Sequence, residues 1–345
     1  MTDRTGVAIV GASGYGSREL IRILLNHPGA EIAVATSRAD DAPTVAAMHP
    51  SLRGRIDLKS EPFDADRIAA VAQVAFLGLP HTASLAVTPA LLDRGVRVID
   101  LSADYRLKSA AVYRQWYGHE HTDPAGLAAA VYGLPELFRD AIPAARLVAN
   151  PGCYTSTAIL ALAPLIAHDR VERSGIIVDA YSGISGAGRT PKASFHFPEA
   201  NENLVAYGVG NHRHTPEIDQ ILTAVGRADD PGADPVEVIF TPHLAPIDRG
   251  IHASIYATPK GAATEDDLAE LYRAFYAGCP FIRIGDQPPG TKDSAGSNFV
   301  DLCVRVVRGR ILVLACLDNL VKGASGVAVQ NFNLITGWPE TTGLL

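Results

Sequence analysis

The stretch GVAIVGASGYGSRELIRILLNHP, residues 6–28, restricts the fold of this 345-residue chain more than any other. An apolar, β-branched run is followed at once by a turn with glycines at 11, 14 and 16, and then by apolar residues at helical spacing. This order predicts a buried strand, a tight turn and a helix, which together form the first unit of a parallel α/β sheet. The small residues of the turn would let a pyrophosphate approach the N-terminus of the helix.

The rest of the chain divides into two patterns. Short strands and helices alternate up to about residue 150, which predicts a Rossmann-type doubly wound parallel sheet over residues 1–150. Residues 151–321 begin with a long helical pattern and continue with longer, hairpin-like strands, which favours an α+β domain around a mixed or antiparallel sheet. The apolar tail, residues 322–345, is predicted to be a helix that completes the first domain.

Charge and cysteine usage exclude several classes of protein. The net charge of −7 gives no electrostatic basis for binding nucleic acid or an anionic membrane. No apolar run reaches the roughly 18 residues of a membrane span, and no basic and apolar signal segment precedes the first strand. The cysteines at 153, 279, 303 and 316 form no CxxC pair or secreted-type framework. We therefore expect a cytoplasmic protein without nucleic-acid or membrane partners.

The glycine turn and the end of the next strand predict a nicotinamide dinucleotide site. The turn residues that would contact it are Gly11, Ser13, Gly14, Tyr15 and Gly16. The following strand ends in ATSRAD, so Ser37 and Arg38 occupy the position where NAD sites usually place an acidic residue. Because an arginine pairs well with a 2′-phosphate, this favours NADP. Alternatively, Arg38 is a solvated loop residue.

Cys153 lies in ANPGCYTSTAIL, on a Pro-Gly turn that leads into an apolar helical pattern. The N-terminus of a helix stabilises a thiolate and so lowers the pKa of a thiol there. This position predicts a nucleophile. The alternative is a buried, inert thiol, as expected for Cys303 and Cys316 within apolar strand patterns.

The segment NHRHTPEI places His212 and His214 two residues apart. In an extended segment, residues i and i+2 point the same way, so the pair could bind a metal ion. The ligand spacing of known zinc sites is missing, and we predict no metal. An imidazole with a pKa near neutrality suits proton transfer instead.

Several motifs, taken in order, resemble the N-acetyl-gamma-glutamyl-phosphate reductase family. They are GASGYGSREL, FLGLPHTAS, VIDLSADYRL, VYGLPEL, NPGCYTSTAILAL, SGISGAGR, NHRHTPEI and DNLVKGASGVAVQN, which cover nearly the whole chain. The chain is similar, more distantly, to aspartate-semialdehyde dehydrogenase. One departure is that Gly16 and Ser17 stand where the family turn usually ends in x-Gly, which leaves the packing of the helix at Ser17 open.

The resemblance implies a second domain of the semialdehyde dehydrogenase type and NADPH-dependent reduction of N-acetyl-L-glutamyl 5-phosphate to the 5-semialdehyde, in arginine biosynthesis. In that reaction a cysteine thiolate attacks the acyl phosphate, and hydride reduces the resulting thioester. The implied catalytic residues are Cys153 and His212. The implied ligands of substrate are Arg106, which would hold the phosphate, together with Arg213 and Glu217. Ser185 and Gly186, in a loop whose N–H groups could bind an anion, and Asn319 would contact the cofactor.

Other functions stay open at this point. A carrier-linked aminoadipate-phosphate reductase shares the cysteine and histidine motifs, but we expect it to need a basic surface for its acidic carrier. Aspartate-semialdehyde dehydrogenase normally lacks the Pro-Gly before its cysteine. A non-catalytic NADP-binding sensor would need neither Cys153 nor the histidine pair. The partners expected are a small acyl-phosphate substrate and further copies of the chain, as a dimer or tetramer.

Overall fold

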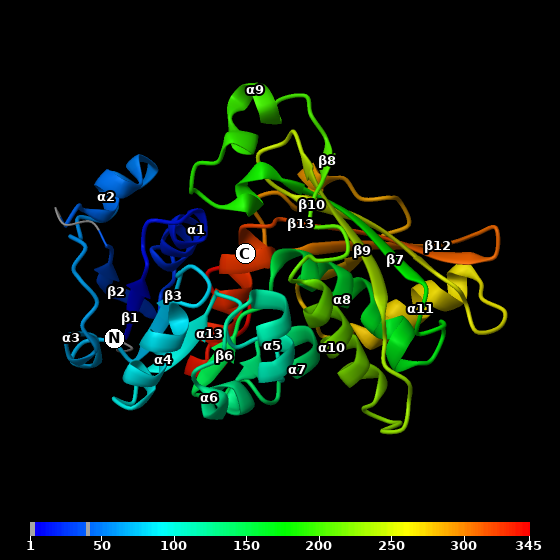
Figure 1. The fold of residues 1–345 in the computed structure, drawn as a ribbon, viewed down its shortest axis with the longest axis horizontal. Coiled ribbons are helices and arrows are strands. Elements are labelled where there is room, and N and C mark those ends of the chain that lie inside the picture. The colour runs from blue at the N-terminus through cyan, green and yellow to red at the C-terminus, as the bar shows by residue number, and fades with distance from the viewer. Residues whose placement is uncertain (1–3, 39–41) are drawn as a thin grey trace. The chain divides into compact units, whose positions relative to one another are not determined.

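The first strand, β1 (Thr5–Val10), is followed by a turn and by helix α1 (Tyr15–Leu24), in the order predicted (Figure 1). The structure is a computed structural model that describes residues 4–38 and 42–345. Its internal contacts divide the chain into two compact units, Met1–Pro151 with Ala324–Leu345, and Gly152–Gly323.

The first unit is built on a six-stranded sheet in the order β2-β1-β3-β4-β6-β5, in which every neighbouring pair is parallel. The order reverses direction at β1, which lies between β2 and β3, as in doubly wound sheets. The predicted parallel sheet is therefore confirmed. The strands after β1 are β2 (Ala30–Thr36), β3 (Val74–Leu77), β4 (Arg97–Asp100), β5 (Val131–Tyr132) and β6 (Leu147–Ala149).

Helices pack on both faces of this sheet. Ala8 and Val10 of β1 belong to an apolar cluster with Ile68. On the opposite face, the ring of Phe76 lies 5.8 Å from that of Phe332, in the C-terminal helix. This burial of both faces explains why the strands are apolar throughout. The helices of the unit are α1, α2 (Val45–Met48), η1 (Pro50–Leu52), α3 (Ala65–Ala69), α4 (Ser84–Leu92), α5 (Ala110–Tyr117), α6 (Pro124–Ala129), α7 (Pro135–Phe138) and α13 (Gly326–Thr336).

The second unit contains a seven-stranded sheet in the order β11-β12-β13-β10-β7-β9-β8. The pairs β7–β9 and β11–β12 are parallel and the other pairs are antiparallel, so the sheet is mixed. The strands are β7 (Ile176–Gly183), β8 (Val205–Ala206), β9 (Val238–Ala245), β10 (Ile251–Ala257), β11 (Ile282–Ile284), β12 (Val300–Val307) and β13 (Arg310–Leu317).

Helices α8, α10 and α11 pack against one face of this sheet (Figure 1). Side chains alternate along each strand, so the opposite face carries Ile177, Ile239 and Tyr256, whose exposed fractions are 42%, 57% and 42%. The helical elements are α8 (Cys153–Ala167), η2 (Ile184–Ala187), η3 (Ala193–Phe195), α9 (Phe197–Ala200), α10 (Thr215–Gly226), α11 (Glu265–Phe275), α12 (Thr291–Ser294) and η4 (Val321–Ser325), a turn of π-helix.

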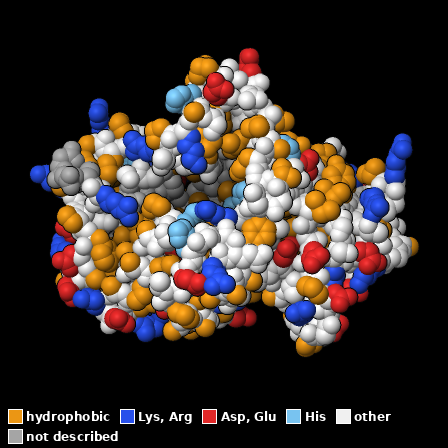
Figure 2. Space-filling model, in the orientation of Figure 1, with side chains coloured by type: hydrophobic (Ala, Val, Ile, Leu, Met, Phe, Trp, Pro, Cys, Tyr) orange, Lys and Arg blue, Asp and Glu red, His pale blue; other side chains and the backbone are white. Residues whose placement is uncertain are grey.

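Acidic and basic side chains are interspersed on the face of the molecule in Figure 2, in keeping with the modest net charge of −7. In the part of the chain that the structure describes, no helix combines the length and the apolar character that crossing a membrane requires.

Candidate active site

Cys153 is the first residue of α8, as the sequence predicts, and Gly152 caps that helix. Every residue from Tyr154 to Ile166 is buried, so the helix lies within the core and its first turn is fixed by packing. The Cys153 thiol is half-buried and forms no disulfide. It therefore lies at the positive end of a well-fixed helix dipole, which favours the thiolate.

Glu217, on the first turn of α10, is bonded to the start of α8. Its carboxylate is 1% exposed and accepts a hydrogen bond from Gly152 N–H at 3.1 Å. Its Oε1 also lies 2.9 Å from the Thr155 hydroxyl. These contacts fix the peptide that precedes Cys153 and give Glu217 a positioning role. The contact with substrate expected of Glu217 stays a prediction.

Gly323 lies directly against Cys153. A Cβ on Gly323 would lie 2.7 Å from the Cβ of Cys153, closer than packing permits, and at a tight 3.3 Å from the carbonyl oxygen of Asp318. The turn η4 that carries Gly323 is held by the buried Asp318, whose Oδ1 accepts the N–H groups of Leu320 and Val321 at 2.9 and 3.1 Å. Such π-helical turns are frequent at functional sites. Here the turn needs a residue without a side chain next to the Cβ of Cys153.

His212 and His214 lie in a cluster of aromatic rings that includes Tyr154 of α8. The centroid of the His212 ring lies 4.8 Å from that of His214 and 6.0 Å from that of Tyr154. Tyr207 and Phe240 approach the same imidazole at 5.4 and 5.2 Å. Burial, followed by the neighbouring Arg213 charge, lowers the pKa of His212 to about 4. The histidine pair and the residue after Cys153 thus belong to one cluster within the second unit.

Ser185 and Asn319 also meet in the second unit. The Asn319 amide donates to the Ser185 hydroxyl at 3.1 Å and accepts from Gly250 N–H at 2.7 Å. The binding of an anion by the backbone N–H groups of this loop stays a prediction. The N–H groups of Ser185 and Gly188 already donate to Asp248 O and Ser185 O. Gly186 follows Ser185 in η2, and its contact with the cofactor stays a prediction.

In the first unit, the glycine turn makes a close backbone crossing between β1 and β3. Gly11 has a φ of +87°, and a Cβ there would lie 2.7 Å from Gly78 O. The turn is tied to β2, because Gly11 N–H donates to the Thr36 hydroxyl at 3.1 Å. Ser17, which replaces the usual glycine, is buried and donates through its hydroxyl to Gly11 O at 2.8 Å. The serine therefore fits the helix and stabilises the turn.

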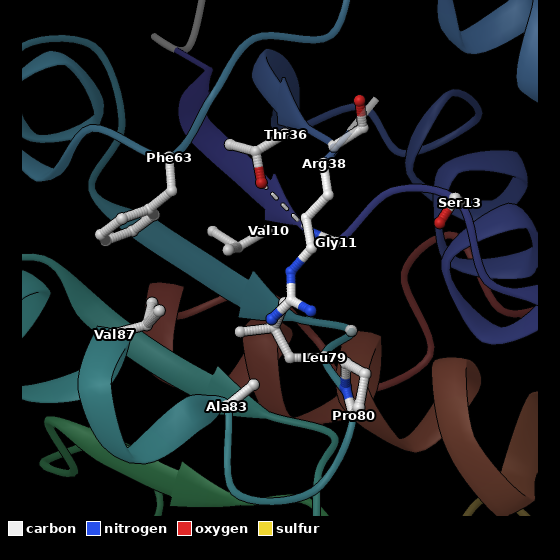
Figure 3. Close-up of a pocket in the computed structure, with 12 residues that line it drawn as sticks. Val10, Gly11, Ser13, Thr36, Arg38, Phe63, Leu79, Pro80, Ala83 and Val87 are labelled. Carbon is white, nitrogen blue, oxygen red and sulfur yellow. Dashed lines mark hydrogen bonds between the residues drawn. The ribbon is translucent and has the colours of Figure 1, made fainter. Parts of the chain in front are cut away.

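A pocket of about 270 Å³ opens at the carboxyl ends of β1, β2 and β3 (Figure 3). Arg38 extends across it toward Leu79, with Phe63 and Val87 to one side and Ser13 at the start of α1. Doubly wound sheets bind nucleotides at this position. The residues that line it are Val10, Gly11, Ser13, Thr36, Ser37, Arg38, Phe63, Gly78, Leu79, Pro80, Ala83 and Val87. Gly14, Tyr15 and Gly16 lie at the N-terminus of α1, beyond this lining.

Arg106 lies in the loop that follows β4, also in the first unit. It is 6% exposed, and its guanidinium donates to Asn150 O at 2.7 Å and to Leu101 O at 2.8 Å. The loop is fixed by Asp104, whose carboxylate accepts the N–H of Thr82 at 2.8 Å and the hydroxyl of Tyr113 at 2.8 Å. Arg106 is thus a rigidly placed cation, not a solvated surface arginine. Its contact with phosphate stays a prediction.

The residues of the first unit fit a nicotinamide dinucleotide, because the pocket that Gly11, Ser13 and Arg38 line lies at the carboxyl ends of the parallel strands, where doubly wound sheets bind nucleotides. The described side chains do not form a set of ligands for a metal ion. Across residues 4–38 and 42–345, no three His, Cys, Asp or Glu side chains are grouped so that they could hold one.

Comparison with known proteins gives the same two parts. Residues 6–145 match the semialdehyde dehydrogenase NAD binding domain, and residues 153–319 match the semialdehyde dehydrogenase dimerisation domain. N-acetyl-gamma-glutamyl-phosphate reductase from Rhodopirellula baltica is 47% identical over 344 residues, which cover 98% of each chain. The enzyme of that name from Geobacter sulfurreducens is 49% identical over 343 residues, or 98% of this chain and 97% of the relative. The chain belongs to the N-acetyl-gamma-glutamyl-phosphate reductase family.

Solved structures support the fold. Aspartate semialdehyde dehydrogenase II from Vibrio cholerae superimposes with a TM-score of 0.73 at 18% identity, covering 97% of this chain and 99% of that one. The aspartate semialdehyde dehydrogenase with NADP from Candida albicans gives a TM-score of 0.66 at 15% identity, covering 97% of this chain and 99% of that chain. The family and the fold class expected from the sequence are thereby confirmed, and the chain carries the family's nicotinamide-binding domain.

Sequence reasoning missed Tyr207, Phe240 and Gly323. Tyr207 and Phe240 are isolated aromatic residues, and only the folded sheet brings them to His212. Gly323 lies in VKGASG, a motif that indicated the family without showing which glycine packs against Cys153.

We predict that Gly323→Ala destabilises the fold and slows alkylation of Cys153. The added methyl group must displace the first turn of α8, and overpacking of this kind costs about 1–3 kcal/mol. Urea unfolding and the rate of iodoacetamide labelling, followed on the Cys153 peptide by mass spectrometry, measure the two effects. The matched control is Gly285→Ala, because the nearest atom to its Cβ lies 3.7 Å away. Equal behaviour of the two variants would contradict the assigned contact.

Proposed function

We propose that the chain catalyses the NADPH-dependent reduction of N-acetyl-L-glutamyl 5-phosphate to N-acetyl-L-glutamate 5-semialdehyde and phosphate, a step of arginine biosynthesis. The observation that carries this proposal is Cys153 at the start of the buried helix α8, with Glu217 and Gly323 fixing its position. The curated relatives that bear the reductase name match this chain over nearly its full length, which supports the substrate.

The chemistry follows from the position of the thiol. The Cys153 thiolate attacks the acyl carbon, the bond from that carbon to the phosphate oxygen breaks, and a thioester forms. The nicotinamide, when bound, supplies a hydride. Hydride addition to the thioester carbon is followed by cleavage of the C–S bond, which releases the aldehyde and restores the thiolate. His212 is assigned the proton transfers of this chemistry.

The binding roles are assigned residue by residue. Arg106 offers a forked cation for the substrate phosphate, and Arg213 and Glu217 contribute to substrate binding. The cofactor pyrophosphate is bound by the glycine turn, that is, by Gly11, Ser13, Gly14, Tyr15 and Gly16. Ser185 and Gly186 contact the cofactor, and the Asn319 amide contacts the nicotinamide carboxamide.

We assign the cofactor-binding role to residues 1–150 with the tail 322–345, and the catalytic and oligomerisation roles to residues 151–321. The exposed apolar side chains on the open face of the seven-stranded sheet, Ile177, Ile239 and Tyr256, support assembly with further copies of the chain, as does the match to a dimerisation domain. Four cysteines without a disulfide fit a reducing compartment, which supports the cytoplasm.

The reaction is tested most simply in reverse, because the acyl phosphate is unstable. We expect purified protein to form NADPH from N-acetylglutamate 5-semialdehyde and NADP only when phosphate is present, measured by absorbance. Cys153→Ala should abolish this activity but bind NADPH normally, whereas Cys279→Ala, the other half-buried cysteine, should keep it. Activity only with aspartate semialdehyde or with the carrier-linked aminoadipate aldehyde would refute the substrate. Binding of NADPH with no activity on any of the three would favour the sensor.

We predict that Arg38→Ala raises the Michaelis constant for NADP by about 10- to 100-fold, the range of a lost charge-assisted contact. The constant for NAD should change less than about threefold, because NAD has no 2′-phosphate. Steady-state kinetics with both cofactors measure this. Arg114→Ala, at an exposed arginine paired with Glu120 in the same unit, is the control. A parallel rise for both cofactors would show that Arg38 does not contact the 2′-phosphate.

A further inference from the structure

The loop between β3 and α4, residues 78–83, contains a residue in an unfavourable backbone conformation. Thr82 has a φ of +72°. In the described part of the chain it is the one β-branched residue with a positive φ, a region where such residues are rarely found. The Thr82 side chain is exposed, so packing of that side chain does not impose the conformation. A contact of the backbone must therefore maintain it.

The turn around Thr82 is of a kind that normally uses glycine. Ala83 N–H donates to Pro80 O at 3.2 Å, which closes a four-residue turn with Thr82 in the third position. A positive φ at this position favours glycine or asparagine. Other residues are disfavoured there by roughly 5- to 30-fold in population. The sequence of the loop thus does not by itself favour the conformation observed.

The carboxylate of Asp104 supplies the contact that maintains this conformation. Its Oδ1 accepts Thr82 N–H at 2.8 Å and its Oδ2 accepts Ser84 N–H at 3.2 Å. Thr82 and Ala83 have φ values of opposite sign, +72° and −76°, and such an alternation turns successive N–H groups toward one anion. Asp104 is fully buried, and Ser84 begins α4, whose N-terminus also favours a carboxylate. The loop is therefore folded around a carboxylate from another segment of the chain.

The same loop forms one wall of the nucleotide pocket. Leu79, Pro80 and Ala83 line the pocket, on the side toward which Arg38 extends (Figure 3). Thr82 lies between Pro80 and Ala83 in sequence, so a change in its φ moves this wall. Asp104 does not itself line the pocket, and it acts on the pocket through the loop.

Asp104 also fixes the loop after β4, to which it belongs. Its Oδ1 accepts the Tyr113 hydroxyl at 2.8 Å in addition to Thr82 N–H. The Ser84 hydroxyl adds a second link between the two loops, because it donates to Asp100 at the end of β4 at 2.9 Å. Arg106 follows two residues after Asp104. The wall of the pocket and the loop that carries Arg106 thus share one buried carboxylate.

We propose that Asp104 is a positioning residue for the cofactor. Its carboxylate holds Thr82 in the left-handed conformation, and so keeps the wall of the pocket in the shape that binds the nucleotide. This inference rests on the proposed function, which identifies the cofactor, and it adds a residue outside the pocket to those that determine cofactor affinity. Through its other contacts, Asp104 fixes the loop that presents Arg106.

Binding of NADPH to the full-length protein tests this proposal, with the dissociation constant measured by fluorescence titration. We expect Asp104→Ala to raise the constant at least about fivefold, because Thr82 then leaves the left-handed conformation for most of the time. The second substitution Thr82→Gly should bring the constant back to within about threefold of wild type, because glycine adopts a positive φ without steric cost.

Thr82→Ala is the matched control for this rescue. It removes the same exposed side chain but keeps the Cβ, so Thr82→Ala combined with Asp104→Ala should bind NADPH as weakly as Asp104→Ala alone. Tyr113→Phe removes one donor to the carboxylate without touching the wall of the pocket, and it should bind NADPH like wild type. Equal rescue by alanine and glycine, or an unchanged constant in Asp104→Ala, would overturn the proposal.

The rescue should be confined to the cofactor. Residue 82 lies outside the loop that carries Arg106, so Thr82→Gly cannot restore that loop when Asp104 is absent. In the reverse reaction, the Michaelis constant for phosphate should therefore stay raised in Asp104→Ala combined with Thr82→Gly. A general loss of stability would affect both ligands alike. Recovery of both constants, or of neither, would contradict the assigned contacts.

Two further measurements keep the test decisive. If Asp104→Ala does not fold, Asp104→Asn repeats the comparison, because it keeps the size of the side chain but has a single acceptor oxygen. Hydrogen exchange of a peptide that spans residues 79–85 needs no ligand, and the N–H groups of Thr82 and Ser84 should exchange faster in the variant. Wild type that does not bind NADPH would refute the proposed cofactor, whereas unchanged exchange would refute the role of Asp104.

Discussion

The hydrogen bond from Gly152 N–H to the buried carboxylate of Glu217 is the contact on which the reactive part of the structure depends. It joins the first turn of α10 to the start of α8, and so fixes the peptide that orients Cys153. Gly323 packs against the Cβ and Cα atoms of the same cysteine. The backbone of Cys153, the proposed nucleophile, is therefore fixed before substrate arrives, which reduces the cost of ordering it during the reaction.

Close backbone packing and buried hydrogen bonds also fix the loops of the first unit. Its glycine turn packs closely against the loop after β3, so Gly11 and Gly78 cross without side chains. The Thr36 hydroxyl accepts from Gly11 N–H, and the Ser17 hydroxyl donates to Gly11 O. Buried carboxylates then fix the loop after β4. Asp100 is fully buried at the end of that strand and burial raises its pKa to about 6, while Asp104 binds Thr82 and Tyr113. Because these carboxylates hold the loop after β4 in place, Arg106 is held in place as well.

Part of the fold and of the candidate site could be predicted from short stretches of sequence. The glycine turn, the parallel sheet and the placement of Cys153 at a helix start follow from residues adjacent in sequence, where period and turn propensity act directly. The surroundings of His212 and the contact of Gly323 with Cys153 join segments far apart in the chain. No local pattern encodes them. The lowered pKa of His212 depends on burial that only the fold creates.

Covalent catalysis by Cys153 is the central claim, and trapping the acyl-enzyme tests it most directly. Wild-type protein would be mixed with freshly prepared N-acetylglutamyl phosphate in the absence of cofactor, quenched in acid, digested and examined by mass spectrometry. The account predicts an N-acetylglutamyl group on the peptide that contains Cys153, which disappears when NADPH is added before the quench. An unmodified Cys153 peptide, or equal acylation of Cys279, would contradict it.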